Sequence, residues 1–384
     1  MDSFSEIKAC YEAGRVMPGL AYRSPDVYEA EVERIFRSGW ISVTCGQNVP
    51  NSGDLFPVRI AGRSLFVTRD GEDQVRVYYN LCRHRGARLV DEPCHARSGH
   101  ITCPYHGWTF GIDGQLKSAP HFYRGTEKTA LDPEDQDRLG LFPVRSAVWR
   151  DIVFVDFSGD AKPFEDFIRP LTDRLVHWTE SELRPLCTDE YEIQANWKFA
   201  AENFIDIYHL PVLHSQIGGG FRGALLAEDI EVSEGIVGVV MPGGYGGYGD
   251  GGDATELSLP RFSGLGEDEQ LRLEVFSIFP NTLMLVEPNF AQVIVLRPQS
   301  AGVTSETFAN YTVSDASQVD SLAAEREEMR RSSLEVNDQD AKLLAGLQLA
   351  RSMDVGGETE TVEAWDTTNR RFQRNWARKL LAAP

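Results

Sequence analysis

The stretch CRHRGARLVDEPCHARSGHITCPYHG, residues 82–107, decides how the N-terminal part of the chain folds. It begins with Cys82-Arg83-His84 and ends with Cys103-Pro104-Tyr105-His106, with eighteen residues between the two motifs. Each of two short segments therefore offers one thiol and one imidazole. Thiolates and neutral imidazoles are ligands that iron–sulfur clusters and zinc both accept. The pattern predicts a metal centre held by two loops.

The spacing of these ligands favours an iron–sulfur cluster over zinc. Zinc fingers usually pair like ligands, whereas each loop here contains one Cys and one His. Two cysteines can then bind one iron and two histidines the other, as in a Rieske [2Fe–2S] centre. Gly86 and Gly107 follow the histidines and allow the backbone close to a cluster. A Cys2His2 zinc site stays open as the alternative. Cys45, Cys94 and Cys187 lack comparable partners, and we expect them to be small apolar fillers.

Short alternating runs around these loops predict a small β domain. ISVTC, LFPVRI, SLFVTRD and VRVYYN follow Trp40, and Asp70-Gly71 supplies a turn between the last two runs. The strand-rich region continues to VWRDIVFVDF at residues 148–157. Ahead of it, Ser24-Pro25-Asp26 marks the start of a helix that ends near Gly39.

A second candidate metal site lies in AENFIDIYHLPVLH, residues 201–214. At helical spacing, Glu202, Asp206 and His209 share one face of a helix. The proline two residues after His209 ends that helix, so the chain can turn and bring His214 back toward it. Two imidazoles with carboxylates beside them suit a divalent metal. Taken alone, such a histidine pair is more often structural than metal-binding.

Composition places the chain among ordinary globular enzymes. Its 384 residues suggest roughly two domains, and the net charge of -20 argues against nucleic acid or an anionic membrane as a partner. No apolar run approaches the length needed to cross a bilayer, and the N-terminus lacks an apolar signal core. Six scattered cysteines do not suggest a disulfide framework. We expect a cytoplasmic protein.

The motifs resemble those of one known family. CRHRGARL and CPYHGWTF closely resemble the two cluster loops of the Rieske non-haem iron oxygenases, and ENFIDIYHLPVLH resembles that family's iron segment, D-x2-H-x4-H. The motifs occur in the family's order, and the resemblance extends over most of the chain. It implies a ring-hydroxylating α subunit of class α+β, with a Rieske all-β domain and a helix-grip (START-like) catalytic domain on an antiparallel sheet. We expect an N-terminal arm and helix at 1–39 that pack with the catalytic domain, the Rieske domain at 40–160 and the catalytic domain at 161–384.

The resemblance also implies the role of each candidate residue. Four residues of the first stretch hold the Rieske [2Fe–2S] cluster: Cys82, His84, Cys103 and His106. His209 and His214 bind a mononuclear Fe(II). Asp206 takes the family's bridging role, in which it links to a Rieske histidine of a neighbouring subunit so that electrons cross the interface.

The iron needs a carboxylate as its third ligand, to complete a two-His-one-carboxylate triad. SSLEVNDQDAKLLAGLQLARS predicts a long helix that is continuous from about Asp315. Asp340 lies on an apolar stripe of this helix, formed by Val336, Leu343, Leu344 and Leu347. An acid is costly there unless it is paired or coordinated, so we predict Asp340 as the ligand. The family pattern of Asp followed eight residues later by Gln (Gln348) agrees, and Asp338 is the reserve candidate.

Alternating runs between residues 184 and 313 predict an antiparallel sheet that covers the metal pocket. Phe276, Met284 and Phe290 are candidates to line that pocket, although most such residues are plain core. GGYGGYGDGGD at 243–253 reads either as a lid over the pocket or as an ordinary loop.

The last expected helix, roughly residues 367–381, carries five basic residues: Arg370, Arg371, Arg374, Arg378 and Lys379. They could dock a subunit or a reductase, or form a solvated face, and we favour the solvated face.

The resemblance implies a terminal oxygenase. A separate NAD(P)H-dependent reductase, with or without a ferredoxin, supplies electrons, and O2 is used to hydroxylate a small organic substrate; oxidative demethylation is a related outcome. The length favours a homotrimer of α subunits alone. Two other classes stay open: a Rieske electron-transfer protein without oxygenase activity, and a zinc hydrolase or zinc-stabilised binding module.

An aromatic substrate ranks ahead of a quaternary ammonium or N-methylated one. Three converging aromatic faces beside a carboxylate would favour the ammonium substrate, because such a cation is bound by aromatic cages. Tyr245 and Tyr248 are the candidates for a cage. An aliphatic pocket with one basic residue would favour an aromatic carboxylate.

Overall fold

The computed structural model describes residues 3–126, 130–214, 225–242, 259–314, 320–353 and 361–382, and the chain forms two compact units. One unit joins residues 1–41 to residues 162–384, and the other comprises residues 42–161. Sheets dominate both units and helices cover the first, which confirms the α+β class. Among the described residues, no helix is long and apolar enough to cross a membrane.

The unit of residues 42–161 is built from three small sheets, in the orders β1-β10-β9, β4-β3-β2-β5 and β6-β7-β8. The strands are β1 (Trp40–Cys45), β2 (Asp54–Ile60), β3 (Arg63–Arg69), β4 (Val75–Tyr79), β5 (Cys94–His95), β6 (His100–Thr102), β7 (Thr109–Gly111), β8 (Leu116–Ser118), β9 (Arg145–Trp149) and β10 (Ile152–Asp156). They confirm the expected strand runs. Asp70 closes the turn between β3 and β4, because its Oδ1 accepts hydrogen bonds from the N–H groups of Glu72 and Gln74, each 2.9 Å long. Short helices add η2 (Gly46–Asn48) and α4 (Pro133–Arg138).

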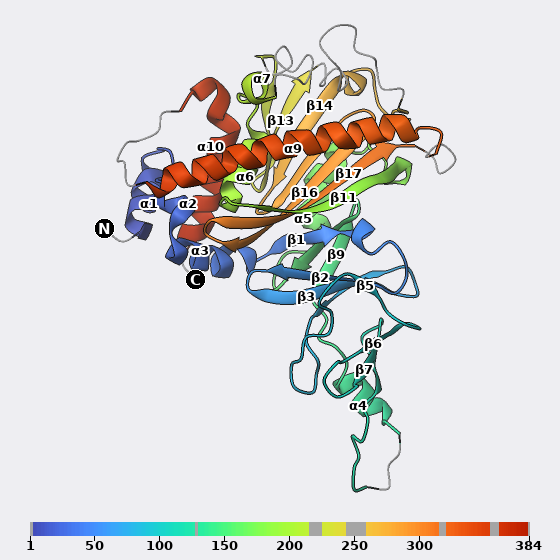
Figure 1. Cartoon of the computed structure of the whole chain (residues 1–384). Helices are drawn as coiled ribbons and strands as arrows, with labels where there is room; N and C mark the ends of the chain where they lie inside the picture. The colour runs from blue at the N-terminus through green and yellow to red at the C-terminus, as the bar shows by residue number, and fades with distance from the viewer. Residues whose placement is uncertain are drawn as a thin grey trace. The chain divides into compact units, whose positions relative to one another are not determined.

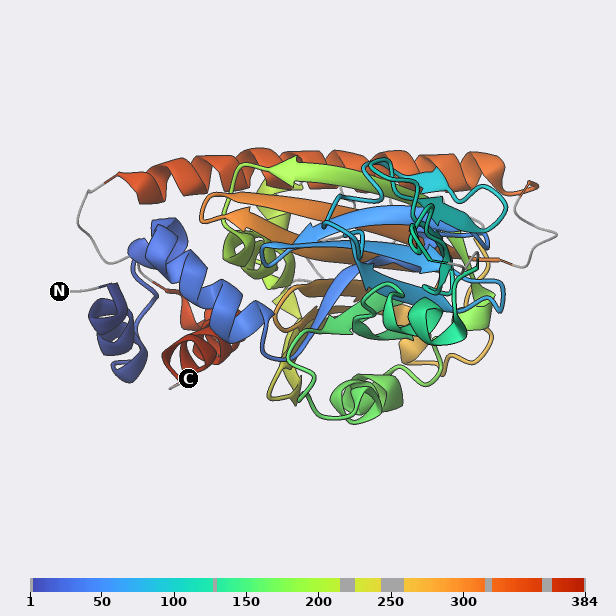
Figure 2. The same ribbon diagram turned by 90° about the horizontal axis from the view of Figure 1, so that it is seen from below.

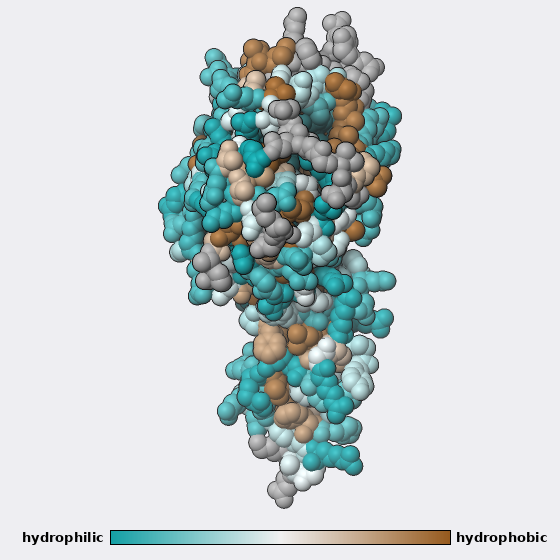
Figure 3. Space-filling model, turned by 90° about the vertical axis from the view of Figure 1, so that its left-hand side faces the viewer, coloured by the Kyte–Doolittle hydropathy of each residue, from teal (hydrophilic) through white to brown (hydrophobic). Residues whose placement is uncertain are grey.

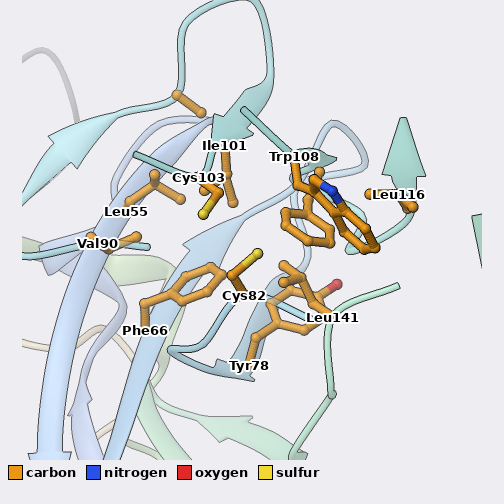
Figure 4. Packing of buried hydrophobic residues seen from close by; sticks show 12 residues of the cluster. Leu55, Phe66, Tyr78, Cys82, Val90, Ile101, Cys103, Trp108, Leu116 and Leu141 are labelled. Atoms are coloured by element: carbon orange, nitrogen blue, oxygen red, sulfur yellow. The ribbon is translucent and has the colours of Figure 1, made fainter. Parts of the chain in front are cut away.

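The hydrophobic core of this unit surrounds two cysteines. Cys82 and Cys103 are each 2% exposed, and Figure 4 shows their sulfur atoms pointing into one space. Leucine, isoleucine, valine and aromatic side chains enclose them: Leu55, Phe66, Tyr78, Val90, Ile101, Trp108, Phe110, Leu116 and Leu141. The apolar walls hold both thiols in place from several strands.

The other unit is organised on a seven-stranded antiparallel sheet, in the order β11-β17-β16-β15-β14-β13-β12. Its strands are β11 (Leu183–Ile193), β12 (Glu228–Ser233), β13 (Ile236–Pro242), β14 (Arg272–Ile278), β15 (Thr282–Val286), β16 (Phe290–Ser300) and β17 (Val303–Val313). The long helix α9 (Ala323–Ser352) lies across one face of this sheet (Figures 1 and 2). α9 begins later than the expected start near residue 315, and it continues through Gly346; residues 315–319 lie outside the described part of the chain.

The described part of this unit contains further helices. They are α1 (Ser3–Glu12), α2 (Leu20–Arg23), α3 (Pro25–Glu31), the π-helical turn η1 (Val32–Phe36), α5 (Phe164–Arg174), η3 (Glu180–Glu182), α6 (Trp197–Ile205), α7 (Leu210–Leu213), η4 (Glu269–Leu271) and α10 (Glu363–Leu381). The expected helix start is confirmed: Ser24 Oγ accepts a hydrogen bond from Val27 N–H and Pro25 is the first helical residue. α1, α2 and α3 form a group beside α10 (Figures 1 and 2).

A buried ion pair ties α3, α6 and α10 together. Lys198 on α6 pairs with Glu31 on α3, and both side chains are almost fully buried. Trp197 Nε1 and Trp376 Nε1 also donate hydrogen bonds to Glu31, over 3.0 and 2.7 Å. A charge pair of this kind tolerates burial only when further hydrogen bonds satisfy it. The network therefore holds the first turn of α6 against α3 and α10.

The surface is mainly hydrophilic, with hydrophobic side chains scattered over it, as Figure 3 shows for one face. The basic residues of α10 divide into two groups. Arg371 lies 3.5 Å from Glu231, and Arg378 pairs with Glu234, so these two fasten α10 to the region of β12. Arg370 and Arg374 are exposed, in line with a solvated face.

Candidate functional site

Two loops of the unit 42–161 have the same backbone hydrogen-bond pattern. Cys82 N–H donates to Ala87 O, and Cys103 N–H donates to Trp108 O, each over 2.7 Å. Gly86 N–H and Gly107 N–H return to the carbonyl groups of the two cysteines. Both glycines have a positive φ, +73° and +72°, which L-residues rarely adopt. The two loops thus have the same backbone conformation. The histidine lies two positions after the cysteine in the first loop (Cys82, His84) and three positions after it in the second (Cys103, His106).

The loops bring together the four residues expected to hold a cluster. His84 Nδ1 and His106 Nδ1 lie 3.1 Å apart, so both rings present the same nitrogen to one point. The imidazoles are exposed, whereas the two thiols are buried in the core. His84 also stacks on Trp108, with ring centroids 5.2 Å apart. A Cys2His2 set with a buried sulfur side and an exposed imidazole side fits a cluster whose histidine-bound iron lies nearest the surface.

The electrostatics of the thiols agree with this fit. Burial raises the pKa of the Cys82 thiol, and the neighbouring Cys103 raises it further. The backbone N–H groups of His84 and Arg85 work in the opposite direction, since they donate hydrogen bonds to the Cys82 sulfur. Thiolates buried beside one another need a cation, and donors to sulfur are one of the ways in which proteins tune iron–sulfur centres.

The other cysteines differ in part from expectation. Cys45 is fully buried, as an apolar filler should be. Cys94 is exposed on the short strand β5, so the filler interpretation is wrong for it. Cys187 is half-buried, and burial together with Asp189 raises its pKa to about 12, which makes it an unreactive thiol.

The second site lies under α9. His209, His214 and Asp340 offer ligand atoms that all lie within 4.8 Å of one another. His214 Nε2 is 3.0 Å from Asp340 Oδ1, and His209 Nε2 is 3.8 Å from the same oxygen. The imidazole planes cross at 78° with centroids 5.1 Å apart. The arrangement matches a two-His-one-carboxylate triad.

Asp206 and His209 do not share a helix with Glu202, contrary to the prediction from helical spacing. α6 ends at Ile205, and Asp206 already has an extended backbone, with ψ at 123°. Asp206 Oδ1 accepts a hydrogen bond from Tyr208 N–H over 2.9 Å, and such a turn competes with continued helix. Glu202 consequently faces away toward Tyr22 and Gln373, whereas His209 and His214 flank the short helix α7.

Both imidazoles are held by their second nitrogen. His209 Nδ1 lies 3.1 Å from Asp206 Oδ2, which turns Nε2 toward Asp340. His214 Nδ1 lies 2.7 Å from Gln339 Oε1. Burial opposes a positive charge on His214, but the hydrogen bond and the charge of Asp340 outweigh it and raise its pKa. A metal-binding histidine usually has its other nitrogen bonded in this way, which fixes the tautomer and the ring orientation.

Residues close together on α9 differ clearly in their burial. Asp340 is partly buried next to His214, whereas Asp338 is exposed. On the expected apolar stripe, Leu344 is buried, but Leu343 and Leu347 are 36% and 39% exposed. Gln348 does not reach the site: its Oε1 accepts a hydrogen bond from Asn196 N–H, over 2.9 Å, at the start of α6.

A pocket adjoins the triad, between the sheet and α9. Its apolar side chains are mainly aliphatic, with two aromatic rings: Ile207, Leu210, Val275, Leu285, Ile294, Val336, Phe204 and Phe308. Its neutral polar side chains are Asn203, Gln292, Ser333 and Asn337. The described lining contains no lysine or arginine, and its charged or titratable groups are Asp206 and the three residues of the triad.

The expected lining residues lie elsewhere. Phe276 and Met284 pair across β14 and β15, and Val275 and Leu285 form the adjacent cross-strand pair. Because side chains alternate along a strand, the pocket side of the sheet carries Val275 and Leu285, and the expected residues are core on the other face. Phe290 is fully buried and is not part of the described lining. Residues 243–253, with Tyr245 and Tyr248, lie outside the described part of the chain.

Sequence patterns missed Gln339 and Gln292. Both are uncharged and carry no spacing signal, and only the fold brings them to the site. The pairing of Glu202 with Tyr22 was equally hidden, since these residues are 180 positions apart.

Comparisons with known proteins identify both units. A family model described as "Ring hydroxylating alpha subunit (catalytic domain)" matches residues 181–382, and one described as "Rieske [2Fe-2S] domain" matches residues 39–143. The chain is 34% identical over 220 residues to the anthranilate 1,2-dioxygenase large subunit of Burkholderia cepacia, over 56% of this chain and 51% of that protein. It is 29% identical over 204 residues to the chloroplastic choline monooxygenase of Atriplex hortensis, over 51% of this chain and 44% of that protein.

A solved structure, the quaternary ammonium Rieske monooxygenase CntA in complex with an inhibitor, has the same fold, with a TM-score of 0.74. That match covers 96% of this chain and 97% of the other at 22% identity. The sequence matches extend over about half the length of the relatives named above.

Proposed function

Because the chain belongs to the family of ring-hydroxylating α subunits, the Rieske non-haem iron oxygenases, we propose that it is the terminal oxygenase component of a system that hydroxylates a small aromatic substrate. The family carries a Rieske [2Fe–2S] cluster and a mononuclear iron. One observation carries the proposal: the chain has two separate ligand sets, one with two Cys and two His, the other with two His and one Asp. A Rieske electron-transfer protein needs only the first set.

In this proposal the Cys and His of the paired loops hold the cluster: Cys82, His84, Cys103 and His106. His209, His214 and Asp340 hold the mononuclear iron, with Asp206 and Gln339 orienting the two imidazoles. A zinc module would account for either set alone, but the Rieske domain match supports the cluster. We take the unit 42–161 as the Rieske domain and the other unit, including the N-terminal arm, as the catalytic domain.

The metal centres supply O2 activation, with electrons from NAD(P)H that arrive through a partner reductase, with or without a ferredoxin. The chain contributes three things. Its apolar side chains limit the room for water beside the triad, Phe204 and Phe308 place two aromatic residues in the lining, and Asp206 holds His209 by Nδ1. A dry, shaped site of this kind confines the substrate next to the open side of the triad.

The lining supports an aromatic substrate ahead of an ammonium one. A quaternary ammonium group needs several aromatic faces, and the described lining has two, Phe204 and Phe308. A carboxylate substrate would be expected to meet a basic side chain, and none lies in the described lining. Rings of moderate size with neutral substituents suit such a pocket.

A quaternary ammonium or N-methylated substrate is the second candidate, and the similarity to choline monooxygenase supports it. The outcome would then be hydroxylation or oxidative demethylation rather than ring mono- or dihydroxylation.

Substrate-dependent O2 consumption tests the proposal. The metal-loaded protein, a surrogate reductase and NADH are offered aromatic compounds in one series and choline-like compounds in another. We expect O2 uptake with an aromatic compound and its loss in His209→Ala. Reduction of the cluster without O2 uptake for any compound would support the electron-transfer class instead, and a colourless protein that contains zinc would support the zinc class.

We also propose that the chain forms a homotrimer in which Asp206 links to a Rieske histidine of the next subunit. The exposed imidazole edge of the cluster loops supports this, because a buried edge would be closed to another subunit.

A further inference from the structure

Gln292 is a polar side chain in an otherwise apolar part of the pocket. It lies on β16, opposite Leu285 on β15 and Asn310 on β17, and is 8% exposed. It lines the same pocket as the triad. Val275, Leu285, Ile294 and Phe308 form the apolar sheet surface around it. A glutamine in such surroundings requires partners for its amide, because an unpaired buried polar group costs free energy.

One end of this amide is satisfied and the other is open. Gln292 Nε2 donates a hydrogen bond to Asn310 Oδ1 over 3.2 Å, and Asn310 is itself fully buried. This hydrogen bond directs Gln292 Nε2 toward Asn310. Within the described part of the chain, Gln292 Oε1 has no hydrogen-bond partner. A carbonyl oxygen that borders a ligand pocket and has no partner within the described protein can accept a hydrogen bond from the ligand.

The rest of the described lining narrows the class of ligand. It has no cationic side chain that would pair with a carboxylate, and its acidic groups belong to the triad and to Asp206. Phe308 lies on β17 beside Asn310, so a ring against it would come close to the amide of Gln292. The substituent that meets Gln292 is therefore an uncharged donor on an apolar ring.

We propose that Gln292 determines specificity by accepting a hydrogen bond from a hydroxyl or amino group on the substrate's ring. The inference rests on the proposed function, because it names the substrate class of the same site. A site built to bond a substrate O–H or N–H rejects the analogue without it, because the buried oxygen is then left unpaired.

Three probes of nearly equal size isolate this contact: phenol, aniline and toluene carry a hydroxyl, an amino and a methyl group on the same ring. Dissociation constants are measured by calorimetry on the metal-loaded protein, and substrate-dependent O2 uptake is measured in parallel. We expect the native protein to bind phenol and aniline about tenfold more tightly than toluene, the range of one hydrogen bond.

The variant Gln292→Leu should bring the three dissociation constants to within about twofold of one another, since its side chain has no acceptor. Gln299→Leu is the matched control, because Gln299 lies on the same strand outside the described lining and its amide donates to Arg297 O. The control should keep the native preference. If Gln292→Leu does not fold, Gln292→Met makes the same test with a flexible apolar side chain.

Equal binding of toluene and phenol by the native protein would overturn the inference, as would an unchanged preference in Gln292→Leu. Anisole carries an oxygen that can only accept a hydrogen bond. If the native protein bound anisole more tightly than phenol, the inference would also be overturned, because the Gln292 amide would then present its nitrogen to the ligand. In each of these cases O2 uptake with an aromatic compound would leave the proposed function standing. If none of the aromatic probes produced O2 uptake, the proposed function itself would be contradicted.

Discussion

Asp340 and Asp338 are the same kind of residue two positions apart, and their surroundings alone distinguish them. Asp340 faces His214, whereas Asp338 is exposed. We expect Asp340→Ala to lose the mononuclear iron and keep the Rieske absorption bands, because the two centres use separate ligands. Metal analysis together with the visible spectrum measures both. Asp338→Ala is the matched control and should keep all its iron; the reverse pattern would show that the other carboxylate is the ligand.

In the proposed assignment, His84 and His106 bind the cluster through their imidazoles and raise its reduction potential. Rieske centres lie at roughly -150 to +300 mV, whereas plant-type all-Cys ferredoxins lie near -400 mV. We expect His84→Cys to lower the reduction potential by on the order of 100 mV or more, or to lose the cluster. A redox titration followed by electron paramagnetic resonance measures this. Cys94→Ala, an exposed cysteine outside the ligand set, should leave the potential unchanged. A native potential in a His84→Cys protein that retains its cluster would refute the assignment.

At the scale of single residues, the sequence was informative where a few adjacent residues determine the local backbone conformation. The cluster loops are closed by hydrogen bonds between residues four and five positions apart, so the spacing of Cys, His and Gly carries most of the structure. The contact between Asp340 and His214 agrees with the expectation that an acid near apolar helix positions needs a partner. Gln339 and Gln292 were not predictable, because a neutral amide matches many environments and only the folded chain shows which one it meets.

At the scale of helices and strands, the sequence predicted less. Where a helix ends and which face of a strand meets the pocket depend on tertiary contacts, which the periodicity of the sequence does not reveal. Helical spacing placed Glu202 with His209, but the carboxylate of Asp206 takes up Tyr208 N–H and α6 ends at Ile205. The sheet was expected, and its strands are present. The predicted pocket face of the sheet was wrong by one residue along the strand: Phe276 was expected to line the pocket, and its neighbour Val275 does so.

We expect Glu202 to make the stability of the protein depend on pH. Burial raises the pKa of its carboxyl to about 7 from an ordinary value of 4.5, although hydrogen bonds from Tyr22 and Gln373 and the charges of Lys198 and Arg351 oppose the shift. A raised carboxyl pKa contributes stability that is fully present below about pH 4.5 and is lost as the pH rises to about 7. The Glu202→Gln variant lacks this loss, so near pH 8 it should gain up to about 3 kcal/mol relative to the native chain.

Thermal unfolding between pH 5 and pH 8 tests this. The difference in midpoint between Glu202→Gln and the native protein should grow in favour of the variant as the pH rises. Glu192→Gln, at an exposed position on β11, should follow the native profile throughout. A Glu202→Gln protein that loses stability with pH as steeply as the native one would place the titration on another group.

At the scale of the whole molecule, one chain carries both ligand sets, in two separate compact units. The buried thiols close the cluster site on the protein side, and the exposed imidazoles leave its other side open. Asp206 lies at the proposed iron site, with one oxygen toward His209 Nδ1 and the other toward the backbone N–H of Tyr208. A bridging carboxylate of this kind can position the iron ligand and also meet a group from another subunit. The proposed route of electrons therefore passes between subunits of a trimer.

Mixed trimers test that route directly. His106→Ala removes the cluster function and His209→Ala removes the iron function, so each variant alone should be inactive. When the two are co-expressed with different tags and purified on both, every trimer contains both kinds of chain. In a cyclic trimer with one direction of transfer, one junction of the three joins an intact cluster to an intact iron site of the next subunit, which predicts about a third of native O2 uptake. Trimers of one variant that carry both tags are the control and should stay inactive. Inactive mixed trimers with full metal content at the intact sites would mean that electrons stay within one chain, and a monomer in analytical ultracentrifugation would remove the interface that Asp206 is proposed to bridge.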